Sequence, residues 1–224
     1  MIADSELILN ADGSIYHLNL LPEDIADTII FVGDPDRVGL VSQYFDSVDI
    51  KKGKREFITH TGTLRGKRLS VISTGIGTDN IDIVMNEVDS LKNVDFVTKS
   101  LKETLTSVDI IRIGTSGSVQ GNVPIGTILA SEYAVGFDTL MQFYIKPYSA
   151  VEVKIQEAIS EQFALLSFKP YVGKASARLL EQYASDLPKG ITMTAPGFYG
   201  PQGRCIRSHN VYPDLIAKAN SFIV

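Results

Sequence analysis

The segment Thr28–Arg37 reads TIIFVGDPDR, a run of large apolar residues that changes abruptly to glycine, proline and charged residues. Its first five residues are β-branched or aromatic, which is typical of a buried strand. Gly33 and Pro35 break the strand, and the apolar spacing from Val38 to Phe45 then predicts a helix. A strand that leads into a helix is the building unit of α/β proteins, so this segment points to that class of fold.

The same alternation continues through the rest of the chain. Further strands are expected over residues 56–63, 69–74, 109–113, 127–130 and 171–172. Further helices are expected after a cap at Asp79 or Asn80, over residues 151–166 and over residues 212–222. The polar segment Asn93–Ser107 is read as a surface helix or an inserted loop. Because no repeat or linker interrupts this order, the sequence predicts an α/β domain with a mixed or mostly parallel sheet.

The composition of the chain, 224 residues of which 44% are hydrophobic, is enough for one domain with a sizeable core. The net charge of −5 is spread without a basic run, so a nucleic acid is not an expected partner. No apolar stretch is long enough to span a bilayer, and MIADSELILN is not ordered like a signal peptide. The single cysteine, Cys205, suits a reducing compartment, and the three histidines have no metal-ligand spacing. A cytoplasmic protein without a membrane or a metal is therefore expected.

Two strand ends have the residue types that bind anions. In FVGDPDR, Gly33 follows the strand directly and Arg37 comes soon after; in IIRIGTSG, Arg112 lies in the strand end and Thr115 in the turn. Glycine lets backbone N–H groups approach an anion, and arginine can pair two phosphate oxygens at once. Because an arginine within a buried strand is costly without an anion or a carboxylate, Arg112 is the most informative of these residues.

Each loop also has an ordinary explanation. GDPDR can be a turn that starts a helix, with Pro35 near the first helical position, and GTSG can be a plain turn. Arg112 can pair with an internal acid. Taken together, the two loops favour one shared anion site, whereas neither matches a dinucleotide-binding fingerprint or a P-loop.

Four motifs, VGDPDRV, KREF, STGIG and RIGTSG, occur in an order and at distances that resemble the nucleoside phosphorylase family, in particular its uridine phosphorylase branch. The resemblance covers the chain from His17 onward. It implies a three-layer α/β/α fold around a central mixed sheet. It also implies phosphorolysis of uridine to uracil and ribose 1-phosphate in pyrimidine nucleoside salvage, with inorganic phosphate as co-substrate and no cofactor.

The resemblance further implies a phosphate site that subunits share. Within one subunit the site is made by Gly33, Arg37, Arg112 and Thr115. Arg55, in KREF, reaches the phosphate from the neighbouring subunit, and His17, in IYHLNL, crosses the same interface to the ribose 5′-hydroxyl group. A homo-oligomer, either a dimer or a hexamer, is therefore expected. Without the resemblance, Arg55 belongs to a solvated charged cluster and His17 is an incidental histidine near a terminus.

The segment Gly197–Arg204, GFYGPQGR, resembles the part of uridine phosphorylases that reads the base. Phe198 is expected to stack on uracil or flank it, and Gln202 carries a donor and an acceptor for a uracil carbonyl and the ring N–H. Arg204 donates to a carbonyl and stabilises negative charge on the leaving base, so Arg112 and Arg204 are the expected catalytic residues. The expected substrate-binding residues are His17, Thr115, Gly117, Phe198, Gln202 and Arg204. The plain alternative is a glycine-rich surface turn.

The chain departs from the family in one respect. Family members continue beyond this sequence and carry there a Glu-Met-Glu motif, whose second glutamate binds the ribose hydroxyl groups. No such motif occurs in residues 1–224, which are read as a single nucleoside phosphorylase-like domain that lacks the family's C-terminal part. Other interpretations are a purine nucleoside phosphorylase, disfavoured by Gln202 and Arg204, and a hydrolytic nucleosidase, disfavoured by the phosphate arginines. A truncated, non-catalytic relative is the remaining alternative, and the missing motif favours it.

Overall fold

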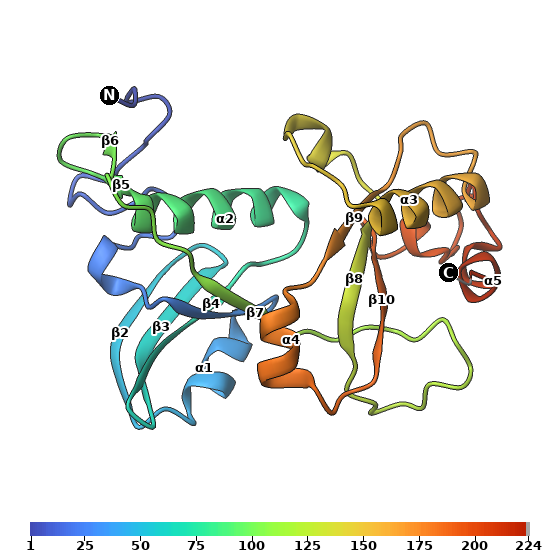
Figure 1. Ribbon diagram of the computed structural model, residues 1–224, viewed down its shortest axis with the longest axis horizontal. Coiled ribbons are helices and arrows are strands. Elements are labelled where there is room, and N and C mark those ends of the chain that lie inside the picture. Colours follow the sequence, from blue (N-terminus) through green and yellow to red (C-terminus); the bar gives the residue numbers. More distant parts are fainter. Residues whose placement is uncertain (223–224) are drawn as a thin grey trace. The chain divides into compact units, whose positions relative to one another are not determined.

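The computed structural model describes residues 1–222 and divides into two compact units, Met1–Thr115 and Ser116–Val224 (Figure 1). Each unit combines strands and helices and has a hydrophobic core of its own, so the predicted α/β class is confirmed. The single domain expected over residues 1–224 stays a prediction, and its last two residues lie outside the described part of the chain.

The sheet of the first unit has the strand order β2-β3-β4-β1-β7. Its strands are β1 (Thr28–Val32), β2 (Ser47–Lys54), β3 (Phe57–Leu64), β4 (Lys67–Ser73) and β7 (Asp109–Arg112). β1 is parallel to both β4 and β7, whereas β3 is antiparallel to β2 and β4. The sheet is therefore mixed, and all its strands except β2 overlap their predicted ranges.

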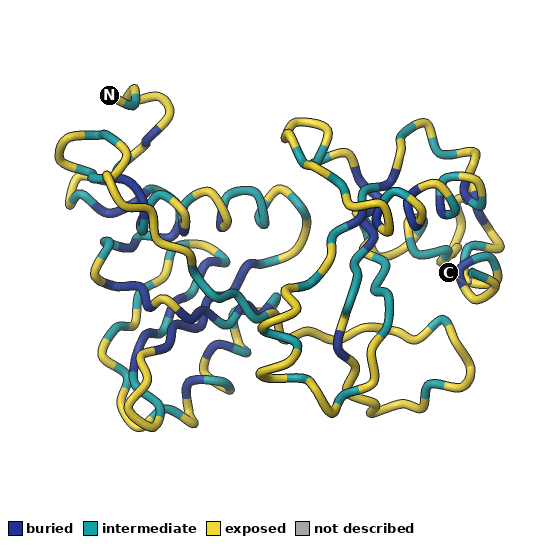
Figure 2. Tube along the Cα trace, viewed as in Figure 1, coloured by how far each residue is buried: buried dark blue, intermediate teal, exposed yellow. Residues whose placement is uncertain are grey.

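Helices cover both faces of this sheet (Figure 1). They are α1 (Asp36–Ser42) and α2 (Thr78–Asn93), and a short 3-10 helix, η1 (Pro22–Asp24), precedes the sheet. Because side chains alternate along a strand, Ile29 and Phe31 of β1 pack with the buried residues of α2, whereas Ile30 and Val32 pack with those of α1. Figure 2 shows the resulting buried run along β1 and β4. The first unit is thus a helix–sheet–helix sandwich.

Two local predictions in this unit were wrong. The helical alternative for Asn93–Ser107 fails, because the segment forms a small hairpin of β5 (Val94–Asp95) and β6 (Ser100–Leu101). The carboxylate of Asp95 closes the hairpin by accepting from the backbone N–H groups of Val97 and Thr98. Neither Asp79 nor Asn80 caps α2, which begins at Thr78 after Gly77, a residue with a φ of 99°.

The second unit contains a smaller mixed sheet with the strand order β10-β8-β9. Its strands are β8 (Ala130–Gly136), β9 (Tyr171–Lys174) and β10 (Lys189–Thr194), and β8 is parallel to β10 and antiparallel to β9. Its helices are α3 (Ala150–Gln162), α4 (Ala177–Ala184) and α5 (Leu215–Asn220), with 3-10 helices η2 (Leu140–Phe143) and η3 (Gly200–Gln202). Its core is formed by β8, β9, α3 and the C-terminal segment. The strand expected over 127–130 begins only at Ala130, and β10 and α4 were not predicted.

The start of α3 depends on one buried carboxylate, that of Glu152. It accepts hydrogen bonds from the backbone N–H of Ser149 (2.8 Å) and its hydroxyl (2.7 Å), and from Nζ of Lys146 (2.8 Å). The Ser149 hydroxyl accepts in return from the backbone N–H of Glu152, which completes a capping box. The hydrogen bond from Lys146, followed by those from Ser149, lowers the pKa of Glu152 to about 2.

We predict that Glu152→Ala lowers the free energy of unfolding by about 1–2 kcal/mol at neutral pH, because the cap and the ion pair are lost together. The pKa of Glu152 in the folded chain lies below its ordinary value of 4.5. The difference in the free energy of unfolding between Glu152→Ala and the wild type should therefore be fully present above pH 4.5. It should shrink as the pH falls toward 2. Urea unfolding at a series of pH values, followed by circular dichroism, measures it.

The matched control is Glu157→Ala, at an exposed position of the same helix. This variant should unfold like the wild type at every pH. A loss for Glu152→Ala that does not change with pH would show that the charge of Glu152 contributes nothing.

Candidate functional site

The carboxyl ends of the three parallel strands of the first unit lie at one edge of its sheet. Phe31 of β1 is level with Arg112 of β7, and Val32 is level with Ser73 of β4. The pairing extends one residue further, because the backbone N–H of Thr74 donates to Val32 (2.8 Å) and that of Ile113 donates to Phe31 (2.9 Å). The loops that begin at residues 33, 74 and 113 therefore leave the sheet side by side, which is where α/β proteins bind ligands.

The guanidinium group of Arg112 lies against two glycines of these loops. A Cβ atom on Gly33 would lie 3.8 Å from Nη2 of Arg112, and one on Gly114 would lie 3.9 Å from both Nε and Nη2. No side chain from either loop residue covers this side of the guanidinium group. The structure thus brings together Gly33 and Arg112, two of the residues predicted to bind phosphate.

The premise that Arg112 lies in a buried strand was wrong. β7 is an edge strand of the sheet, its first three residues are half-buried, and Arg112 itself is exposed. The cost of burying a charge therefore does not apply here. The alternative, that Arg112 pairs with an internal acid, is also wrong for residues 1–222, in which its guanidinium group forms neither an ion pair nor a hydrogen bond. Arg112 is an unpaired, accessible positive charge.

Two further phosphate candidates lie in the same loops. Arg37 is in the first turn of α1, half-buried, and its backbone N–H donates to the carbonyl of Asp34 at 3.1 Å. Thr115 is exposed and is the last residue of the first unit. Within the described chain, neither side chain forms a hydrogen bond or an ion pair with Arg112. Both residues lie near the carboxyl edge of the sheet because Arg37 follows β1 closely in sequence and Thr115 follows β7.

Arg55 lies in the two-residue turn between β2 and β3, with a φ of 57°. The next residue, Glu56, accepts a hydrogen bond from Nδ2 of Asn80 at 3.0 Å and packs against Gly75. A hydrogen bond from its own backbone lowers the pKa of Glu56 most, followed by the Asn80 bond and then by the charges of Arg55 and His17. The turn that carries Arg55 is therefore joined to the loop that follows β4, at the same edge of the sheet.

His17 is held by Glu87, a residue of α2 that sequence reasoning missed. Nδ1 of His17 lies 2.6 Å from Oε1 of Glu87, and the backbone N–H groups of His17 and Leu18 donate to the same carboxylate. His17 therefore has a structural partner, and its role at the ribose stays a prediction. A signal was present, because Glu87 interrupts the apolar spacing of α2, whose Val84 and Val88 are buried.

The loop predicted to read the base lies in the second unit and is fixed by its own hydrogen bonds. Nε2 of Gln202 donates to the carbonyl of Gly197 at 3.0 Å, and Nη1 of Arg204 donates to Oε1 of Gln202 and to the carbonyl of Phe198, the latter at 2.7 Å. The Arg204 guanidinium carbon lies 4.0 Å from the centroid of the Phe198 ring. Arg204 therefore contacts both Phe198 and Gln202.

The loop leaves part of Arg204 free. Its Nε and Nη2 atoms form no hydrogen bond with any of residues 1–222, and both Phe198 and Arg204 are exposed. The Sγ atom of Cys205, the next residue, lies 2.7 Å from the carbonyl of Ser208. Gly117 is exposed near the start of the second unit, and a Cβ atom there would meet nothing within 4 Å. The fixed guanidinium group has donors left for a ligand.

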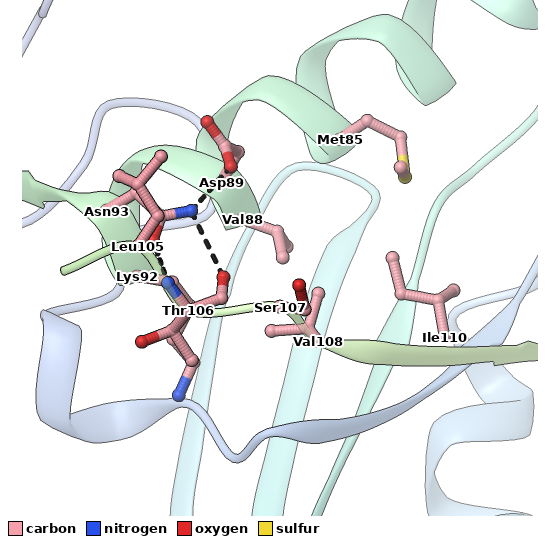
Figure 3. Close-up of a pocket in the computed structure, with 10 residues that line it drawn as sticks. All are labelled: Met85, Val88, Asp89, Lys92, Asn93, Leu105, Thr106, Ser107, Val108 and Ile110. Carbon is pink, nitrogen blue, oxygen red and sulfur yellow. Dashed lines mark hydrogen bonds between the residues drawn. The ribbon is translucent and has the colours of Figure 1, made fainter.

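A cavity of about 430 Å³ lies elsewhere in the first unit, beside α2. Met85 and Val88 of α2 line it together with Val108 and Ile110 from the region of β7 (Figure 3). It contains none of the predicted site residues. The described chain also holds no group of three or more histidine, cysteine, aspartate or glutamate residues that could bind a metal ion. None of the helices within residues 1–222 is long and apolar enough to cross a membrane.

The sequence is similar to known phosphorylases. A uridine phosphorylase of Thermococcus kodakarensis is 28% identical over 195 residues, which is 86% of this chain and 59% of that protein. A DeoD-type purine nucleoside phosphorylase of Hahella chejuensis is 28% identical over 204 residues, which is 84% of this chain and 80% of that protein. The chain thus spans less than two thirds of the Thermococcus relative.

The structure gives the same result. A nucleoside phosphorylase of Trypanosoma brucei, whose crystal structure is described as showing uridine phosphorylase activity, superposes with a TM-score of 0.86 at 30% identity. The match covers 96% of this chain and 78% of that one, and it confirms the predicted nucleoside phosphorylase-like α/β/α fold. A sequence model of the phosphorylase superfamily matches residues 27–220. With nearly the whole chain matched, this protein belongs to the phosphorylase superfamily.

Proposed function

We propose that this protein is a uridine phosphorylase, which splits uridine with inorganic phosphate into uracil and ribose 1-phosphate. The observation that carries the proposal is the unpaired guanidinium group of Arg112 against Gly33 and Gly114, at the carboxyl edge of parallel strands. A fixed positive charge beside bare backbone suits a phosphate ion. Similarity to proteins named as uridine phosphorylases supports the choice of reaction.

In the proposed reaction, a phosphate oxygen forms a bond to the anomeric carbon of ribose as the bond from that carbon to the base nitrogen breaks. The electron pair of the broken bond leaves with uracil, which takes up the proton that the phosphate ion loses. Arg112 would hold the phosphate ion in register with the sugar, and Arg37 and the hydroxyl of Thr115 would add donors. Such orientation of two reactants lowers a barrier by about 7–11 kcal/mol in favourable cases.

The loop of the second unit would handle the base. Phe198 offers an exposed aromatic face, and Arg204 keeps N–H donors free for a uracil carbonyl that gains negative charge as the bond breaks. Gln202 would exchange its internal hydrogen bonds for those of the uracil edge. An arginine that offers only donors fits a carbonyl and disfavours the exocyclic amine of adenine.

We further propose a homo-oligomer, in which Arg55 and His17 serve the site of a neighbouring copy of the chain. The two residues lie beside the same helix: Glu56, which follows Arg55, accepts a hydrogen bond from Asn80 of α2, and His17 contacts Glu87 of α2. The only co-substrate proposed is inorganic phosphate, and no other cofactor is included. The single cysteine supports a cytoplasmic location.

The purified protein should release uracil and ribose 1-phosphate from uridine only when inorganic phosphate is present. Inosine and adenosine are tested in parallel, because a purine nucleoside phosphorylase is among the similar proteins. Cleavage of inosine or adenosine faster than uridine would show that the substrate is a purine nucleoside. Release of uracil without phosphate would indicate a hydrolase, and no turnover by the folded protein would indicate a non-catalytic relative.

Arg112→Ala should raise the KM for phosphate on the order of 10- to 100-fold, because a hydrogen bond to a charged group contributes about 1.5–3 kcal/mol. Arg112→Lys should recover only part of this loss, since lysine keeps the charge without the two-pronged geometry. The matched control is Arg65→Ala, in the exposed turn between β3 and β4 at the opposite edge of the sheet. Initial rates at varied phosphate measure the effect, and an unchanged KM would remove Arg112 from the site.

Gln202→Ala should lower kcat/KM for uridine by about tenfold or more and leave the KM for phosphate nearly unchanged, because the base loses a donor and an acceptor. Gln182→Ala, on the exposed surface of α4, is the control in the same unit. Initial rates at varied uridine and then at varied phosphate separate the two effects. Equal losses for both substrates would rule out base reading by Gln202.

A further inference from the structure

The carboxylate of Glu87 collects the N–H groups of a chain segment far away in sequence. Its Oε2 accepts from the backbone N–H of Leu18 at 2.8 Å, and both of its oxygens lie within 3.1 Å of the backbone nitrogen of His17. Its Oε1 lies 2.6 Å from Nδ1 of the His17 ring. The Glu87 side chain is 13% exposed and that of His17 is 26% exposed, so the contact is largely shielded from water.

A carboxylate is unexpected on this face of α2. Glu87 lies on α2 beside Val84, Val88 and Leu91, which are all buried, so an apolar residue would suit its helix face. The two backbone N–H groups need an acceptor, which explains part of the arrangement. The third contact satisfies no backbone group. It acts only on the imidazole ring of His17.

The third contact fixes which ring nitrogen carries the proton. An ionised carboxylate can only accept hydrogen bonds, so Nδ1 of His17 must be the donor. In the neutral ring Nε2 is then an acceptor, and it forms no hydrogen bond with any of residues 1–222. The rings of Tyr16 (4.7 Å between centroids) and Phe57 (6.3 Å) meet the imidazole edge to face and limit its rotation.

The segment that carries His17 is also held from its other side. Nζ of Lys54 donates to the carbonyl of Tyr16 at 2.6 Å and to Oδ1 of Asn10 at 3.0 Å, and it lies 3.9 Å from the centroid of the Tyr16 ring. The backbone around His17 therefore has anchors that do not involve Glu87. A change at Glu87 can alter the ring without releasing the segment.

We propose that Glu87 is a positioning residue for the nucleoside site, which holds His17 with Nδ1–H toward α2 and presents Nε2 as an acceptor for the 5′-hydroxyl group of the nucleoside. This inference rests on the proposed function, in which His17 meets the ribose of a substrate bound to a neighbouring copy. Glu87 itself touches no substrate. Its effect is to select the tautomer that can accept a proton from a hydroxyl group.

The orientation of His17 can be tested without any activity. Nitrogen-15 NMR of the imidazole groups should show His17 of the wild type as the Nδ1–H tautomer, assigned by comparison with His17→Ala. Glu87→Gln places an amide donor beside groups that need acceptors and should change this spectrum. Glu103→Gln, an exposed carboxylate outside α2, is the matched control and should not. A wild-type His17 with its proton on Nε2 would overturn the proposal.

The consequence for the substrate is tested with uridine and 5′-deoxyuridine. Glu87→Gln should lower kcat/KM for uridine by about 2- to 10-fold, the contribution of one hydrogen bond, and should leave that for 5′-deoxyuridine nearly unchanged. In the His17→Ala background, Glu87→Gln should have no additional effect on uridine. Equal losses for the two nucleosides would show a merely structural role and would overturn the proposal.

The two experiments also separate this inference from the function on which it rests. If the wild type cleaves neither nucleoside, the proposed function fails, and the proposed contact with a nucleoside hydroxyl fails with it. The NMR spectrum then still decides whether Glu87 sets the tautomer of His17. If uridine is cleaved and only the spectrum disagrees, the positioning role fails while the phosphorylase remains.

Discussion

The parallel alignment of β1 with β4 and β7 is the constraint on which the rest of the first unit depends. Hydrogen bonds from Thr74 and Ile113 to the end of β1 bring three separate loops to one edge. The glycines that flank the Arg112 guanidinium group come from two of these loops, and the third leads into α2. Because α2 carries Glu87, the same alignment also sets where His17 is held.

The sequence predicted those strands and helices in which burial produces a clear pattern of apolar residues. β1 and β4 are buried over most of their length, and both were predictable from runs of β-branched and apolar residues. β2 was not, because it is an edge strand that alternates only between exposed and half-buried residues and is rich in lysine. β10 and α4 contain no buried residue, and α4, although amphipathic, is only eight residues long. Tertiary contacts decide such segments.

The candidate site shows the same division. Motifs identified Gly33, Arg112 and the Gly197–Arg204 loop, since their residue types follow directly from the chemistry of anions and flat bases. Arg112 is exposed although a buried strand was predicted there, because a four-residue run such as DIIR does not reveal that its strand lies at the edge of the sheet. Glu87 could not be paired with His17 from sequence, since 70 positions separate them. Only the packing of α2 joins them.

The division of the chain at residue 115 has an evolutionary consequence. Under the proposed function, the residues that bind phosphate all precede this point, whereas Phe198, Gln202 and Arg204 follow it. Mutation or recombination in the later half of a gene would then change the specificity for the nucleobase. The residues that bind the phosphate nucleophile would be inherited unchanged. A superfamily that includes both pyrimidine and purine enzymes is the outcome that such a layout favours.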